Sequence, residues 1–124
     1  MNNLGLIFLL IAVALGSLAQ VLLKKGGSVI SQLSISWQDF IILIKEVLTN
    51  FYVMGWVILG GLSALFWIVA ISKLNLSFAA PVALSLGIVL TVILAKIFLG
   101  ENISFMGWIG VFVVILGILL LVNK

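Results

Sequence analysis

The chain has 124 residues, of which 65% are hydrophobic and 7% are charged, whereas a soluble domain carries about 25% charged residues. Because a chain of this length cannot hide so much apolar surface from water, the composition excludes a soluble globular domain and predicts an integral membrane protein. The net charge of +3 comes from lysines that lie beside apolar runs, which indicates contact with lipid headgroups and argues against nucleic-acid binding.

The first apolar run covers residues 4–23, and about 20 apolar residues are needed to cross ~30 Å of hydrocarbon. A cleaved signal peptide is the alternative for this run. However, no positive charge precedes it, and Lys24 and Lys25 follow where a small-residue cleavage site is expected. We therefore predict a retained first transmembrane helix.

The next segment is too short and too charged to span a membrane, but its apolar residues recur at helical spacing. Ser36 followed by Asp39 resembles a capping box at the start of a helix of about residues 37–49. This pattern predicts an amphipathic helix that lies along the membrane surface. A solvated connector is the alternative. The apolar positions are Trp37, Phe40, Ile41, Ile44 and Leu48.

Three further apolar runs, at about residues 51–72, 76–99 and 103–122, are each long enough to span. Only three residues separate each neighbouring pair, so these helices form antiparallel hairpins. The predicted fold class is therefore all-α: an integral membrane bundle of four transmembrane helices with the interfacial helix between the first and second. We expect residues 1–124 to form a single transmembrane domain.

The lysines give a shallow topology signal. The side that holds the first and third connections carries up to four lysines, including Lys24, Lys25 and Lys45, and the other side carries Lys73 and Lys124. Because cytoplasmic loops are richer in lysine, this bias places both termini outside, but it is small enough to permit insertion both ways.

Polar, small and aromatic residues inside the spans are candidates for a substrate chamber. Gly16 and Gln20 share one face of the first helix, where small residues otherwise serve close helix packing and a carboxamide otherwise bonds to a neighbouring helix. Trp67 lies deep in the second span, where core packing is the alternative. Pro81 is a hinge candidate unless it falls in the first turn of its helix. Ser85 completes the set of residues that we predict to line the chamber.

The pattern of small residues in the fourth span predicts a contact with a second subunit. Gly110 and Gly117 are seven residues apart, and together with Val114 they form a smooth stripe suited to a helix–helix seam. Four helices provide too few walls to enclose a solute, so we expect a homodimer or a heterodimer with a homologous subunit.

Little in the chain supports catalysis. It has no Cys and no His, and its three acids are scattered near the predicted membrane boundaries. Because thiols, imidazoles and paired carboxylates supply most metal sites and acid–base chemistry, we expect no metal, no cofactor and no enzymatic activity.

Three segments of the chain carry recognisable motifs: residues 19–24 (AQVLLK), 70–81 (AISKLNLSFAAP) and 98–104 (FLGENIS), and GWIG at 107–110 follows the third. In this order and spacing they resemble the drug/metabolite transporter superfamily, specifically its four-helix members, which are small multidrug resistance-like and EamA-like. The resemblance covers nearly the whole chain and implies a transporter in a prokaryotic inner membrane that acts as a dimer.

The resemblance also bears on mechanism. Small multidrug transporters couple protons to cationic drugs through a glutamate on the first helix, and Gly16 occupies that position here. The nearer likeness is to four-helix subunits that flip lipid-linked aminoarabinose, which also lack this glutamate. It implies that Lys24 lies at headgroup depth and attracts a lipid phosphate, although a lysine there also serves as a topology anchor.

Three functions follow as hypotheses. The leading one is a dimeric transporter or flippase for a lipid-linked sugar or small metabolite, with membrane lipid as its surroundings. A second is a small multidrug-type exporter of cationic compounds. A third is a non-transporting accessory subunit of a membrane enzyme.

Overall fold

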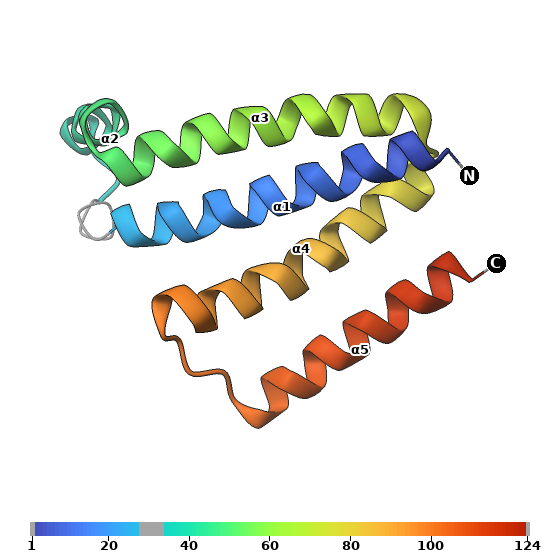
Figure 1. The fold of residues 1–124 in the computed structure, drawn as a ribbon. Helices are drawn as coiled ribbons and strands as arrows, with labels where there is room; N and C mark the ends of the chain where they lie inside the picture. Colours follow the sequence, from blue (N-terminus) through green and yellow to red (C-terminus); the bar gives the residue numbers. More distant parts are fainter. Residues whose placement is uncertain (1, 28–33, 124) are drawn as a thin grey trace.

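The computed structural model describes residues 2–27 and 34–123, and this part of the chain forms five helices and no strand (Figure 1). Lys124, which entered the topology argument, lies outside the described residues. Four of the helices, α1, α3, α4 and α5, are long and apolar enough to cross a bilayer, which confirms the predicted all-α membrane bundle. The bounds are α1 Asn3–Gly26, α2 Trp37–Thr49, α3 Phe51–Lys73, α4 Leu76–Leu99 and α5 Phe105–Val122.

Polar caps set the ends of the helices. The Asn2 side chain accepts a hydrogen bond from the Leu4 N–H at the start of α1. At the end of α4, Gly100 has φ of 65°, a left-handed conformation that favours glycine, and its N–H bonds to the Ala95 carbonyl. Ser104 caps α5, so this helix begins at Phe105, slightly later than the apolar run at 103 suggests.

The central helix of the bundle is α1, which lies between α3 and α4 (Figure 1). In its most apolar 18-residue stretch 28% of the residues are buried, against 6%, 11% and 6% in α3, α4 and α5. Its buried positions include Ala12, Ser17 and Ala19, whose small side chains let the neighbouring backbones approach closely. By contrast, α5 packs mainly along α4.

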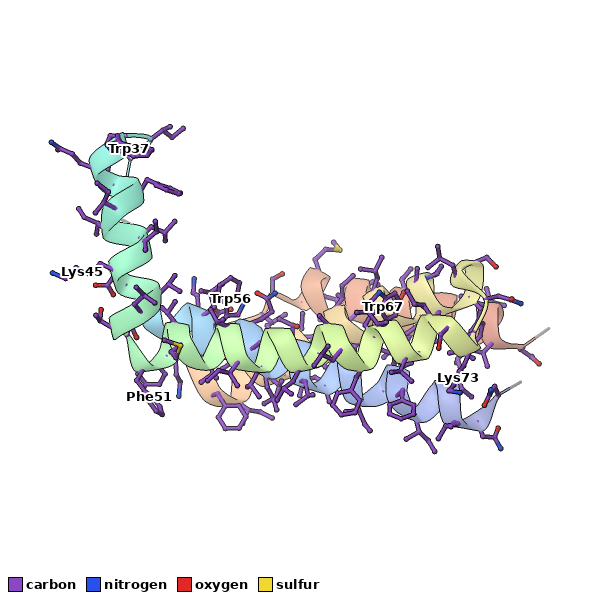
Figure 2. The ribbon with its side chains drawn as sticks, turned by 90° about the horizontal axis from the view of Figure 1, so that it is seen from above. Trp37, Lys45, Phe51, Trp56, Trp67 and Lys73 are labelled. Atoms are coloured by element: carbon purple, nitrogen blue, oxygen red, sulfur yellow. The ribbon has the colours of Figure 1, made fainter. Side chains whose placement is uncertain are left out.

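The helix predicted between the first two spans is α2. Ser36 caps its start as expected, because the Ser36 Oγ accepts a hydrogen bond from the Asp39 N–H. The reciprocal half of the capping box differs, because the Asp39 carboxylate accepts from the Ser34 N–H in place of the Ser36 N–H. No residue of α2 is buried. Figure 2 shows that α2 runs across the end of α3 and extends to the side on which Trp67 lies, whereas Phe51 points away from that side.

Asn50 joins three helices. Its N–H bonds to the Glu46 carbonyl at the end of α2, and its side-chain Oδ1 accepts from the Tyr52 N–H at the start of α3. Its Nδ2 donates to the Gly26 carbonyl at the end of α1, at 3.1 Å, and to the Glu46 carboxylate, at 3.2 Å. The approach is close, since a Cβ at Gly26 would lie 2.8 Å from the Tyr52 Cβ.

We predict that Asn50→Asp lowers the free energy of unfolding by about 1–3 kcal/mol. Aspartate keeps the oxygen that caps α3, but it replaces the Nδ2 donor with an oxygen that faces the Gly26 carbonyl and the Glu46 carboxylate. SDS-induced unfolding in mixed micelles, followed by tryptophan fluorescence, measures the loss. The control is Asn102→Asp, at an exposed site between α4 and α5. Equal stability of the two variants would contradict the role of the amide.

Hydrogen bonds also set the charge state of Asp39. Its carboxylate accepts from the Ser34 Oγ at 2.6 Å, the Ser36 Oγ at 2.7 Å and the Ser34 N–H at 3.1 Å. These bonds, with the Ser34 hydroxyl contributing most, hold the pKa of Asp39 below its ordinary value. Because this pKa is lowered in the folded chain, the bonds stabilise the start of α2 at neutral pH, and that stabilisation is lost as the pH falls through the lowered pKa.

Removal of one of these donors should therefore raise the pKa. We expect Ser34→Ala to move the pKa of Asp39 upward toward its ordinary value, measured by NMR titration of the carboxyl carbon. Ser72→Ala is the matched control, because the Ser72 hydroxyl bonds to the Val69 carbonyl on its own helix. An unchanged Asp39 pKa in the Ser34 variant would show that the serine bonds do not form.

Candidate functional site

Three of the spanning helices, α1, α3 and α4, enclose a groove with a volume of about 790 Å³. On α1 the groove extends from Ala12 to Gln20, which corresponds to about 12 Å of helix. It therefore lies in the middle part of the spans. Its lining consists mostly of small and aliphatic side chains: Ala12, Val13, Gly16, Ser17, Gln20, Ser63, Trp67, Ala80, Ala83, Leu84, Gly87, Ile88, Thr91 and Val92.

Four side chains bring hydrogen-bonding groups to the lining: the Ser17 and Thr91 hydroxyls, the Gln20 carboxamide and the Trp67 indole N–H. Ser17 is 3% exposed. Across residues 2–27 and 34–123, none of these four groups bonds to another group of the chain. Their hydrogen-bonding capacity is therefore not used within this part of the chain.

One further polar group in the groove serves the fold. The Ser63 hydroxyl donates to the Ala12 carbonyl at 2.7 Å and so joins α3 to α1. Gly16 lies directly beside it, because a Cβ at position 16 would be 3.1 Å from the Ser63 Oγ. Gly16 therefore both permits close helix packing and contributes to the groove wall.

Charged side chains are absent from the lining within the described part of the chain. The acids are Asp39 and Glu46 on α2 and Glu101 between α4 and α5, and Figure 1 shows that these elements lie at the same end of the bundle. Because the groove is at mid-depth, any solute in it interacts with neutral groups and with the dipoles of the backbone.

The groove brings together three of the six residues predicted to bind substrate, namely Gly16, Gln20 and Trp67. Trp67 also packs against the buried core, so chamber lining and core packing both apply to it. Figure 2 places its side chain in the half of α3 that is nearer Lys73. Their role in binding stays a prediction.

The other three predicted residues lie elsewhere. Lys24 is exposed one turn beyond Gln20, at the end of α1. Pro81 is exposed and is the sixth residue of α4, so it lies beyond the first turn, and its ring leaves the Ser77 carbonyl without the usual helical partner. Ser85 is half-buried and is not part of the lining.

Three hydroxyl-bearing lining residues, Ser17, Ser63 and Thr91, were not among the residues predicted to bind substrate. The signal was present, since each is a hydroxyl within an apolar span, and polar groups inside membrane spans are rarely without a role. The same rule that selected Gln20 would have selected them.

The stripe predicted for subunit contact divides into two parts. Gly110 and Gly117 are exposed, and a Cβ at either position meets nothing within 4 Å. Val114 is half-buried. It lies three residues after the buried Val111 and therefore on the same side of α5, the side that packs against α4. The two glycines thus leave a smooth open face on α5, and contact with a second subunit stays a prediction.

Comparison with known proteins supports the resemblance inferred from the motifs. Residues 35–123 match the EamA-like transporter family. The chain is 35% identical over 101 residues to the "Probable 4-amino-4-deoxy-L-arabinose-phosphoundecaprenol flippase subunit ArnE" of Aeromonas hydrophila subsp. hydrophila, covering 81% of this chain and 88% of that protein. A protein of the same description from Aeromonas salmonicida is 34% identical over 97 residues, covering 78% and 84%. No solved structure matches significantly.

These matches extend over most of the chain and agree with its four spanning helices. They therefore identify a specific family within the superfamily. The chain belongs to the EamA-like transporter family and is a multi-pass inner-membrane protein of the drug/metabolite transporter superfamily.

Proposed function

We propose that this chain is a transporter subunit that moves the polar head of a lipid-linked sugar along the groove between α1, α3 and α4. The observation that carries the proposal is the groove itself, which has a volume of about 790 Å³ and neutral hydrogen-bonding groups at mid-depth. Sites for small molecules commonly have volumes of about 300–1,000 Å³. The two relatives are described as subunits of a flippase for a sugar attached to phosphoundecaprenol.

An open groove suits a lipid better than a fully soluble metabolite. The wall formed by α1, α3 and α4 covers the groove incompletely. A polar head can therefore leave water for the neutral hydrogen-bonding groups of the groove, while its hydrocarbon chain stays in the surrounding lipid. This arrangement avoids the large cost of an unpaired polar group in hydrocarbon without a closed chamber.

A second subunit supplies the missing wall in this proposal. The relatives are described as subunits, and the open face of α5 at Gly110 and Gly117 allows another helix to approach closely. The partner is a second copy of this chain or a homologous chain. We expect its contact along α5 to place further helices beside the bundle.

Exchange of protons for cationic drugs is less well supported. Position 16, where the resemblance expects the coupling acid, is Gly16, and the groove lining among the described residues has no carboxylate. Without a carboxylate in the groove, a drug cation and a proton have no shared binding group at which one could displace the other. We therefore expect transport of the lipid-linked sugar to persist when the proton gradient is dissipated.

We infer that α2 lies along the membrane surface at one end of the groove. It has no buried residue, and it runs across the end of α3 (Figure 2). It carries apolar side chains such as Trp37 and Phe40, whose ring centroids are 5.7 Å apart in a stacked arrangement. A helix with these features is stable where one side meets hydrocarbon and the other meets water.

Gly87→Leu tests the groove directly. A Cβ at Gly87 meets nothing within 4 Å and Gly87 lines the groove, so we expect a leucine side chain there to occupy groove space, and its better helix propensity favours the helix. We expect the rate of lipid flipping to fall at least tenfold. The matched control is Gly61→Leu on α3, which also has open space around its Cβ but does not line the groove.

The measurement uses protein purified from its native membrane in mild detergent, so that a partner subunit is retained. Proteoliposomes receive a fluorescent polyprenyl-phosphate sugar, and quenching from outside reports the fraction that has changed leaflet. A Gly87→Leu protein that flips at the wild-type rate would refute the groove as the pathway. Proton-coupled exchange of quaternary ammonium cations at ordinary rates would refute the flippase. Absence of any transport would favour an accessory subunit.

A further inference from the structure

A second cavity, with a volume of about 360 Å³, lies at the end of the bundle where both α1 and α4 begin. None of its lining residues belongs to the groove. Figure 1 shows the start of α1, the α3–α4 connection and the end of α5 together at this end, and Figure 2 places Lys73 there. Because four spans begin or end here, the cavity lies at the membrane boundary. The lining is Asn2, Lys73, Leu74, Asn75, Phe78, Leu121 and Val122.

Close packing holds the walls of this cavity in place. At the buried Gly5, α1 meets the α3–α4 connection so closely that a Cβ would lie 2.8 Å from the Leu74 Cγ and 3.1 Å from the Lys73 Cβ. Leu74, Phe78 and Leu121 also pack against the buried core. These contacts fix the apolar wall and the backbone position from which the Lys73 side chain extends.

The polar part of the lining offers hydrogen-bond donors. Across residues 2–27 and 34–123, no hydrogen bond within the chain uses the Lys73 ammonium, the Asn75 side chain or the Asn2 Nδ2. Asn75 directly precedes α4, where an asparagine usually caps the helix, but its side chain makes no cap bond. Asn2 uses its Oδ1 for the Leu4 N–H, which leaves its amide group as a donor.

These groups favour an anion. An ammonium group has three donors and no acceptor, so it pairs with negatively charged oxygens. Because α1 and α4 both begin at this end, their helix dipoles add to the positive potential that the lysine creates. The three acidic side chains of the chain belong to α2 and to the α4–α5 connection, at the opposite end of the bundle (Figure 1).

The apolar wall distinguishes a lipid from a soluble anion. Leu74, Phe78 and Leu121 lie beside the lysine and the two asparagines in one cavity. A lipid phosphate has the same division, since its charged oxygens are attached to hydrocarbon. A free phosphate ion would use the donors and leave the apolar wall without a contact, so it would gain nothing from that wall.

We propose that this cavity binds the phosphate group of a lipid at the membrane boundary. Lys73 pairs with the charge of the phosphate, the Asn75 and Asn2 amides donate to its oxygens, and the apolar wall contacts the first part of the hydrocarbon. The site is separate from the groove, so it goes beyond the proposed function, and the lipid bound there does not have to be the cargo.

Four probes test the chemistry of the site on wild-type protein in nonionic micelles, with any partner subunit retained. They are a short-chain isoprenyl phosphate, the corresponding isoprenol, short-chain phosphatidylglycerol and inorganic phosphate. Calorimetry gives the affinity, and NMR of the ¹⁵N-labelled Asn75 side-chain amide reports whether this cavity is occupied. We expect saturable binding and a shift of the Asn75 signal with a phosphate-bearing lipid, and the tighter of the two identifies the lipid class.

Two variants test the named side chains. Lys73→Gln removes the charge and keeps most of the length, and Asn75→Asp keeps the shape and adds a negative charge. Since a carboxylate is favoured at a helix N-terminus, Asn75→Asp should not weaken α4. We expect each variant to weaken binding of the phosphate lipid at least tenfold. The matched control is Lys25→Gln, which alters a lysine at the end of α1 outside both cavities and should keep the wild-type affinity.

Several outcomes would overturn the proposal. An isoprenol that binds as tightly as the isoprenyl phosphate would show that the phosphate is not recognised. Inorganic phosphate that binds as tightly as either lipid would show that the hydrocarbon contributes nothing. A loss with Lys25→Gln equal to that with Lys73→Gln would show that the lysines act only as general surface charge. If Lys73→Gln does not fold, Asn75→Asp and the comparison of the four probes still decide.

Discussion

The close approach of α1 to α3 is the contact on which the rest of the bundle depends. At its centre the Ser63 hydroxyl donates to the Ala12 carbonyl at 2.7 Å, and Gly16 leaves space for that hydroxyl one turn later. Lipid provides no hydrophobic drive between helices, so packing of small residues and hydrogen bonds must hold them together. A single interhelical bond of this kind contributes about 0.6 kcal/mol on average, which makes the small residues around it as important as the bond.

The same small residues account for the groove. Where α1 turns Ala12, Gly16 and Ser17 toward its neighbours, these small side chains leave space between it and α4. On the opposite wall Ala80, Ala83 and Gly87 are also small, although Leu84 and Ile88 line it too, and Trp67 from α3 is the aromatic side chain of the lining. Close packing on one side of α1 and an open groove on another are thus two consequences of one sequence feature.

The sequence predicted the elements well and their relative orientation less well. Run length and short connections were sufficient for the four spans, and the Ser36–Asp39 pair was sufficient for the start of α2. Gln20 was predicted to line the groove because it is a polar residue within the first span, and Trp67 because it is an aromatic residue far from the ends of the second span. The direction in which Pro81 and Ser85 face was not predictable, because α3 and α4 are apolar all around and local periodicity cannot show which side meets a neighbour. The role of Asn50 also depends on a residue far away in the chain, Gly26.

The central claim is that cargo passes through the groove between α1, α3 and α4, and cysteine accessibility tests it most directly. The chain has no native cysteine, so Gly87→Cys introduces a single thiol into the lining, and Gly61→Cys introduces one outside it. In proteoliposomes, the account predicts that a small polar thiol reagent modifies the cysteine at position 87 and that a lipid-linked sugar slows this modification. The cysteine at position 61 should show no such protection. A thiol at position 87 that is unreactive, or that reacts at the same rate with and without the lipid, would contradict the account.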